Sequence, residues 1–193
     1  METSAPCVSL AVHATAPCAA AEQTAARLLG SLGDRWLHTA GVARRAAELA
    51  EPLGLEPDVL VAAAWLHDIG YAQVAVVTGF HPLDGARYIA GLLWPARIAD
   101  LVAHHSGARF VATARGLSPE LAAYRDEGGP MSDALTYADQ TVGVTGQRVA
   151  LSERRAEMLR RHGSESWNAK VDHIRGPHLR AMAARVERRL ASF

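Results

Sequence analysis

The stretch whose residue types most favour chemistry runs from Ala62 to Ala72, with the sequence A-A-A-W-L-H-D-I-G-Y-A. In it, small and apolar residues lead directly into His67 and Asp68. A buried aspartate is rare unless it is paired or coordinates a metal. The alternative is a helix C-terminus with His67 near the negative end of the dipole and Asp68 turned to water. A carboxylate is unfavourable at that end, so the pair is a candidate functional site.

Four other places put an imidazole or a carboxylate at the edge of an apolar helix: His38, His81, His104-His105 and Asp139. A single histidine of this kind is more often structural or solvated, but five such places are hard to explain as independent accidents. Mixed imidazole and carboxylate ligands suit Mn, Fe, Zn or Ni, and carboxylate-rich sites suit Mg or Mn. Seven candidate ligands exceed the four of a single zinc ion. The sequence therefore predicts a divalent metal site with one or two ions. Two ions that share a carboxylate would use the whole ligand set.

The order of these residues resembles the signature of the HD superfamily of metal-dependent phosphohydrolases. His38 matches the first histidine, His67 and Asp68 match the doublet, and Asp139 matches the last aspartate. The wording H-D-I-G at residues 67–70 is a common form of that doublet. The resemblance implies an all-α fold, the HD-domain helical bundle.

Two further segments are similar to histidine motifs of the branches of this superfamily that bind two metals. They are F-H-P-L-D-G-A at 80–86 and V-A-H-H-S-G at 102–107, and with them the resemblance covers about residues 35–142. Those branches include cyclic-di-GMP phosphodiesterases and symmetrical diadenosine tetraphosphate hydrolases. The cyclic-di-GMP class typically has lysine after H-D-I-G and a G-Y-P triplet after the double histidine. This chain has Tyr71 at the first place and lacks the triplet, which counts against cyclic dinucleotide hydrolysis.

The resemblance implies hydrolysis of a nucleotide-like phosphate ester by metal-activated water. In this arrangement Asp68 is the candidate catalytic residue, because it bridges two metals. One metal is then held by His38, His67 and Asp139. The second is held by His81 and by His104, His105 or both, among which the sequence does not decide.

Two other residues near these motifs are candidates for substrate contacts. Arg109 follows the double histidine closely and is a candidate for pairing with a second phosphate, because guanidinium matches phosphate bidentately. The alternative for Arg109 is an ordinary surface position. Tyr71 is expected either to shape the pocket or to serve packing.

Two functions compete with phosphate ester hydrolysis. Some members of the HD superfamily hold a di-iron centre with the same residues and act as oxygenases that cleave C–C or C–P bonds. A non-catalytic HD domain acting as a sensor or binding module is the third hypothesis. Measuring metal content together with oxygen consumption would separate the hydrolase from the oxygenase.

Helices account for nearly all of the periodic sequence, so the predicted fold class is all-α. We expect Asp34 to cap a helix from Arg35 to about Glu51. The next helix starts near Pro57, and the link between them is short, so the two helices should be antiparallel neighbours. His38 would then lie level with His67 and Asp68. The other expected helices cover residues 19–32, 82–93, 96–105, 117–124, 131–142, 152–162 and 177 onward, with a loop or short strand at 71–80.

Composition indicates one soluble domain of 193 residues. Acidic and basic residues balance at 20 each, so no duplex nucleic acid partner is expected, and no run is apolar enough for a membrane span. We expect residues 1–18 to be a disordered leader and residues 19–193 to be a single HD domain with C-terminal helices. The two cysteines, Cys7 and Cys18, suggest no disulfide scaffold, which favours a cytoplasmic protein. The expected partner is a small phosphorylated, nucleotide-like substrate, and the oligomeric state stays open.

Overall fold

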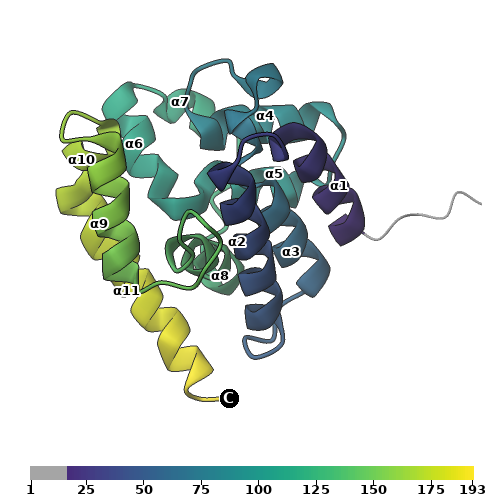
Figure 1. Cartoon of the computed structure of the whole chain (residues 1–193), viewed down its shortest axis with the longest axis vertical. Helices are drawn as coiled ribbons and strands as arrows, with labels where there is room; N and C mark the ends of the chain where they lie inside the picture. The colour runs from purple at the N-terminus through teal and green to yellow at the C-terminus, as the bar shows by residue number, and fades with distance from the viewer. Residues whose placement is uncertain (1–16) are drawn as a thin grey trace, which may run out of the picture.

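The computed structural model describes residues 17–193 as an all-α bundle (Figure 1), which confirms the predicted fold class. Its helices are α1 (Pro17–Leu29), α2 (Asp34–Ala50), α3 (Pro57–Leu66), α4 (His81–Gly91), α5 (Ala96–His104), α6 (Ala108–Arg115), α7 (Ser118–Leu121), α8 (Gly129–Gln140), α9 (Leu151–His162), α10 (Trp167–Lys170) and α11 (Asp172–Leu190). Three short 3₁₀ turns complete it: η1 (Ile69–Tyr71), η2 (Gln73–Ala75) and η3 (His105–Gly107). Among these described residues, extended pairing is limited to an isolated bridge between Val142 and Arg148. The predicted leader lies outside the described residues except for its last two positions, which begin α1.

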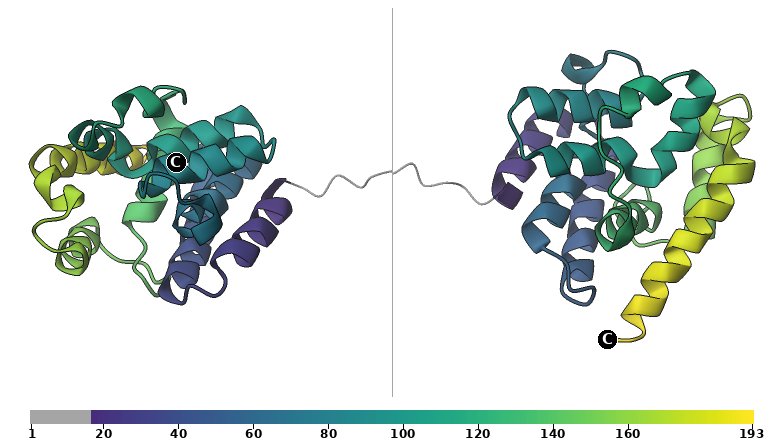
Figure 2. Two further views of the ribbon diagram at one scale, coloured as in Figure 1. Left: turned by 90° about the horizontal axis from the view of Figure 1, so that it is seen from above. Right: turned by 180° about the vertical axis from the view of Figure 1, so that it is seen from behind.

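The core forms where α2 and α3 pack against each other between α1, α5 and α8 (Figures 1 and 2). Alanines dominate this contact, with Ala43 and Ala46 on one helix and Ala62 and Ala63 on the other, all buried. Small side chains let helix axes approach closely. The predicted antiparallel pairing is confirmed, because the His38 and His67 rings lie 5.6 Å apart between their centroids.

The buried face of α2 is shifted around the helix relative to the face that periodicity indicates. Spacing favours Trp36, Ala40, Ala43, Ala47 and Ala50 as the apolar face, yet Ala47 is exposed. Val42 and Leu49 are buried instead, and they share their face with His38. Their larger side chains remove more apolar area from water than alanines do. His38 therefore lies on the core side of α2 and not at its margin.

The segment between α3 and α4, expected as a loop or short strand, consists of η1, η2 and bends. The Asp84 carboxylate fixes its end by accepting hydrogen bonds from the backbone N–H groups of Thr78 and Gly79. Gly70 is in contact with the start of α4, and a Cβ at that position would lie 2.1 Å from the His81 carbonyl oxygen. This close approach holds the His67-Asp68 segment against the first turn of α4.

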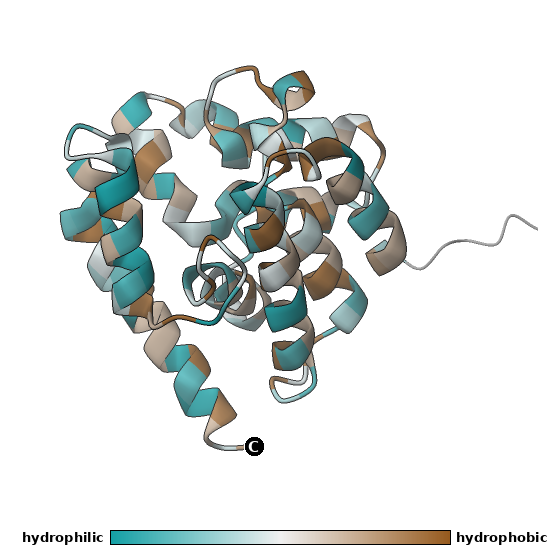
Figure 3. Cartoon of the chain, viewed as in Figure 1, coloured by the Kyte–Doolittle hydropathy of each residue, from teal (hydrophilic) through white to brown (hydrophobic). Residues whose placement is uncertain are grey.

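The C-terminal helices α9, α10 and α11 form a layer beside the bundle (Figures 1 and 2). Helix α9 is strongly hydrophilic (Figure 3), and its one buried residue is Arg154. The predicted start of the last helix at Pro177 is wrong, because α11 begins at Asp172 and holds Pro177 in its interior. Helix α6 is not expected from the sequence, since residues 106–130 show no clear period. No helix between residues 17 and 193 combines the length and apolarity that crossing a membrane requires.

Candidate metal centre

Six of the seven predicted metal ligands come together in two adjacent groups. The first group is His38, His67 and Asp139, and the second is Asp68, His81 and His105. Within each group, the potential ligand atoms lie within 4.8 Å of one another. Both groups are buried except for His81, which is half-buried.

Element ends deliver these side chains to one point. His38 lies in the first half of α2, and His67-Asp68 directly follow α3. His81 begins α4, and Asp139 lies one residue before the end of α8. Each helix also buries an apolar face along its length, and this packing fixes the position of its ligand side chain.

The first group is built around the Asp139 carboxylate. Its Oδ1 lies 2.9 Å from His38 Nε2 and 3.9 Å from His67 Nε2. Its Oδ2 accepts hydrogen bonds from the Ser106 hydroxyl and from Gln140 Nε2. These two donors fix the orientation of the carboxylate and leave Oδ1 directed at the two imidazoles.

Asp68, a member of the second group, also lies close to the first. Asp68 Oδ1 lies 3.4 Å from His81 Nε2, whereas Oδ2 lies 3.4 Å from His67 Nε2 and 4.0 Å from His38 Nε2. His105 Nε2 lies 3.3 Å from His81 Nε2. The two oxygens of Asp68 therefore face different groups, which is the geometry that a bridging carboxylate needs.

The hydrogen bonds of three imidazoles fit metal ligation. The Nδ1 atoms of His38, His67 and His105 lie 3.2, 2.7 and 2.6 Å from the backbone oxygens of Gly143, Ala64 and Val102. A backbone oxygen only accepts, so each Nδ1 carries the proton and each Nε2 offers a lone pair. Imidazoles that bind metals are held in this way by a second hydrogen bond.

The surroundings of two Nε2 atoms show that the described residues do not fully satisfy them. His67 Nε2 is buried and makes no hydrogen bond to the described residues. His38 Nε2 faces both Asp139 Oδ1 and the Arg154 guanidinium, an acceptor and a donor, and a single tautomer cannot satisfy both. A cation placed among the Nε2 atoms would satisfy the lone pairs of His67 and His38. The residues therefore fit a divalent metal.

The protonation of the carboxylates and of two imidazoles suits metal binding. Burial alone would raise the pKa of Asp68, but the Arg35 charge beside it outweighs burial and holds that pKa well below its usual value. The pKa of Asp139 is also well below its usual value despite burial, because of the contacts of its Oδ1 with His38 and Arg154. Burial lowers the pKa of His81 and of His105, whereas the charge of Asp68 raises the pKa of His67 against its burial. Ionised carboxylates and neutral imidazoles are the forms that ligate metals, so a bound metal ion competes with a proton at His67.

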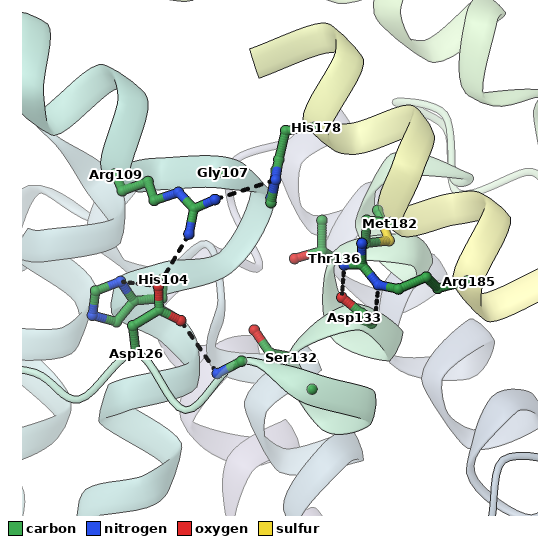
Figure 4. Close-up of a pocket in the computed structure, with 12 residues that line it drawn as sticks. His104, Gly107, Arg109, Asp126, Ser132, Asp133, Thr136, His178, Met182 and Arg185 are labelled. Carbon is green, nitrogen blue, oxygen red and sulfur yellow. Dashed lines mark hydrogen bonds and ion pairs between the residues drawn. The ribbon is translucent and has the colours of Figure 1, made fainter. Parts of the chain in front are cut away.

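His104 does not join the cluster, so of the two adjacent histidines the structure brings only His105 to it. Helix α5 ends at His104, and His105 is already extended, with φ −60° and ψ 154°. The change from helical to extended backbone at this point directs the two imidazoles to different sides. Ser106 and Gly107 then take left-handed conformations, with φ 55° and 68°, and turn the chain into α6. His104 Nε2 donates to the Tyr124 carbonyl at 2.9 Å, in a different pocket (Figure 4).

Arg109, the candidate for pairing a second phosphate, also lies in that other pocket, so the structure does not bring it to the metal cluster. Its guanidinium lies 3.5 Å from the Asp126 carboxylate and 3.3 Å from His178 Nδ1 (Figure 4). The pocket has a volume of about 350 Å³ and contains no member of the two ligand groups. Arg109 is the second residue of α6, directly after η3.

Other arginines take the place predicted for Arg109. Arg35 donates to Asp68 Oδ2 at 2.5 Å, and its guanidinium stacks on the Tyr71 ring at 3.9 Å from the centroid. Arg154 lies 3.8 Å from Asp139 Oδ1, and Arg175 and Arg161 line the same cavity. Arg35 could have been found from the sequence, because it precedes His38 by three positions on one helix face. Nothing in the sequence links the other three to the cluster.

Tyr71 has both of the roles that the sequence leaves open for it. Its ring stacks on the His81 imidazole at 4.2 Å between centroids and lines the cavity. Burial and the charge of Asp68 raise the pKa of Tyr71 to about 12, so its hydroxyl stays protonated at neutral pH.

Comparison with known proteins decides the family. A family model described as HD domain matches residues 35–143, which is more than half of the chain. The chain belongs to the HD domain family. HD domains bind divalent metals and are commonly metal-dependent phosphohydrolases, and the matched segment contains both ligand groups. No curated protein and no solved structure gives a match to this HD domain.

Proposed function

We propose that this HD domain is a metal-dependent phosphohydrolase that cleaves a nucleotide-like phosphate ester. The observation that carries the proposal is the pair of ligand groups that meet at Asp68, next to a cavity lined by arginines. Guanidinium groups bind phosphate oxygens. Membership of the HD domain family supports metal-dependent hydrolysis as the reaction class.

The protein's own residues supply the positioning in this proposal. Bound divalent ions would lower the pKa of water and neutralise phosphate oxygens. His38, His67 and Asp139 would hold one ion, His81 and His105 a second, with Asp68 between them. Arg35 keeps Asp68 ionised, and Ser106 and Gln140 orient Asp139. The Tyr71 hydroxyl is protonated and cannot act as a base at neutral pH. The role of Tyr71 in this proposal is to shape the cavity.

The decisive experiment combines elemental analysis with an anaerobic substrate panel. The purified protein is assayed for Mn, Fe, Mg, Ni and Zn, and phosphate release is then followed with nucleotides and simple phosphate esters in the absence of oxygen. We expect one or two equivalents of metal and phosphate release without oxygen. Turnover that requires both iron and oxygen uptake would instead identify an oxygenase of the di-iron type.

Asp68→Asn separates catalysis from a mere binding role. Changes around a metal site that leave its ligands in place cost about 10–100-fold, so loss of the shared carboxylate should lower kcat/KM by at least about 100-fold. Asp34→Asn, at the exposed start of α2, is the matched control and should retain activity. Metal content and activity equal to those of the control would overturn the role of Asp68. Bound metal without turnover of any ester by the unchanged protein would instead make this HD domain a non-catalytic module.

A further inference from the structure

The cavity beside the metal centre carries more positive charge than its carboxylates balance. Four of the side chains that line it are guanidinium groups, Arg35, Arg154, Arg161 and Arg175, and two are carboxylates, Asp68 and Asp139. The excess is two positive charges before any metal ion binds. Cations next to a metal centre repel the metal, so this arrangement costs binding energy unless an anion joins it.

Three of these arginines come from outside the segment that the HD domain model matches. Arg154 and Arg161 belong to α9 and Arg175 belongs to α11, whereas the match ends at residue 143. Arg35, inside the match, is bound to Asp68 and stacked on Tyr71. Arg154 is paired with Glu157 and lies beside Asp139. Among the described residues, the charge that no ion pair balances is therefore that of Arg161 and Arg175 in the C-terminal layer.

Arg154 reaches the first ligand group. Its Nη2 lies 3.4 Å from His38 Nε2 and 3.8 Å from Asp139 Oδ1. Its Nη1 donates to Glu157, which does not line the cavity, at 3.0 Å. Its Nε is buried without a hydrogen bond among the described residues. A buried guanidinium with an unused donor is costly, and a ligand oxygen would relieve that cost.

Arg175 approaches the same cavity from α11. Its Nε donates to the Ser106 carbonyl oxygen at 2.8 Å, and the residue is only 6% exposed. No ion pair to Arg175 occurs among residues 17–193. The Nε hydrogen bond fixes the plane of the guanidinium and leaves its two terminal nitrogens for a ligand. Arg161 is exposed and lines the mouth.

The size of the cavity limits what enters it. Its volume is about 60 Å³, and a water molecule needs roughly 10–15 Å³ of such space. A phosphoryl group fits such a space, and ester substituents extend through the mouth. Charge distinguishes the esters, since a phosphate monoester carries close to two negative charges at pH 7 and its diester carries one.

We propose that Arg154, Arg161 and Arg175 select the dianionic end of a phosphate monoester and reject diesters. This inference rests on the proposed hydrolysis and narrows it. The oxygen of water forms a bond to phosphorus and the ester P–O bond breaks. Inorganic phosphate leaves, and the departing alcohol oxygen takes up a proton from the water. The three arginines are positioning residues.

Binding measurements test the selection independently of turnover. Calorimetric titration of the Mn²⁺-loaded protein with inorganic phosphate and with dimethyl phosphate compares a largely dianionic ligand with a monoanion. We expect phosphate to bind at least about 10-fold more tightly, because one charged hydrogen bond accounts for that factor or more. Equal affinity for the two ligands overturns the inference.

Variants on one helix assign the effect to the C-terminal layer. Arg161→Ala should weaken phosphate binding by about 10-fold and leave dimethyl phosphate binding nearly unchanged. Arg160→Ala, the neighbouring exposed position, does not line the cavity and is the matched control. Arg154→Gln should act like Arg161→Ala, with urea unfolding as the check on folding. Equal phosphate affinity in the Arg160 and Arg161 variants overturns the assignment.

Turnover measurements distinguish failure of monoester selection from failure of the proposed phosphohydrolysis. Activity is compared on 4-nitrophenyl phosphate and bis(4-nitrophenyl) phosphate, and on nucleoside monophosphates and their methyl diesters. A preference for diesters overturns monoester selection but leaves phosphohydrolysis intact. Absence of turnover on every ester, with selective phosphate binding retained, overturns the proposed function and leaves the anion selection in place.

Discussion

At the scale of single residues, the site depends on which nitrogen each imidazole presents. Three histidines donate Nδ1–H to a backbone carbonyl and turn Nε2 toward the two carboxylates. His104 and His105 show how narrow this choice is, because they are adjacent in the chain and end in different pockets. Each residue can therefore be tested against a close neighbour that lacks its role.

His105→Gln and His104→Gln make such a pair. We expect His105→Gln to remove at least half of the bound metal and to lower activity by about 100-fold, because it deletes one of three ligands in its group. His104→Gln should keep the metal, with a modest loss of stability from its hydrogen bond to Tyr124. Elemental analysis of the two proteins is the measurement. Equal metal loss in both would contradict the assignment of His105, and not His104, as a ligand.

Cys18 gives a prediction on pH. Its Sγ donates to Asp58 Oδ1 at 3.3 Å, and burial together with that carboxylate raises the pKa of the thiol to about 11. The thiolate is the reactive form, so alkylation at pH 8 should be roughly 100-fold slower than for an ordinary cysteine and should still accelerate above pH 10.

The measurement uses Cys7→Ser protein, so that Cys18 is the one thiol in the chain. Asp58→Asn in that background removes the negative charge and should shift the alkylation profile to lower pH. An unchanged profile would show that the carboxylate does not govern this thiol.

At the scale of elements, close approaches between helix ends decide where the ligands lie. Gly70 meets the first turn of α4, and Gly41 of α2 meets Gly146 in the 142–149 turn. The second contact brings the Gly143 carbonyl to His38 Nδ1 at 3.2 Å. Glycine is needed at both places because a side chain would separate segments that carry or orient ligands.

Gly70→Ala tests this at η1. The added Cβ would lie 2.1 Å from the His81 carbonyl oxygen, so backbone must move and we expect a loss of about 1–3 kcal/mol in the free energy of unfolding. Displacement of His81 should also weaken metal binding. Gly91→Ala, at the end of α4 with open space around it, is the control and should be neutral or stabilising by up to about 1 kcal/mol. Urea unfolding of both variants is the measurement.

At the scale of the whole molecule, the metal centre lies where most of the elements meet. Its ligands follow or belong to α2, α3, α4, α5 and α8, and α9 and α11 add charge from the other side. A cation bound here would join parts of the chain that lie 101 positions apart, as His38 and Asp139 do. Metal binding should therefore stabilise the entire bundle.

Chelation tests this coupling. A ligand present at about 100 times its dissociation constant, and bound only by the folded state, adds about 2.7 kcal/mol to the free energy of unfolding. We expect Mn²⁺ or the native metal to raise the urea midpoint accordingly, and a chelator to reverse it. Asp139→Asn should lose most of the response. A metal effect of equal size in that variant would place the binding elsewhere.

The sequence by itself determined the all-α class, the antiparallel pairing of the helices that carry His38 and His67, and six residues that come together in two candidate ligand groups. The first two follow from local periodicity and from spacing, which the chain carries in consecutive residues. The ligand set rests on the resemblance to the HD superfamily as well. Only the tertiary structure decided between His104 and His105, since α5 ends at His104 and the extended backbone of His105 directs its side chain elsewhere. It also replaced Arg109 with Arg154, Arg161 and Arg175. No local pattern could place those three, because contacts across more than 100 positions, such as that between His38 and Arg154, depend on how whole helices pack.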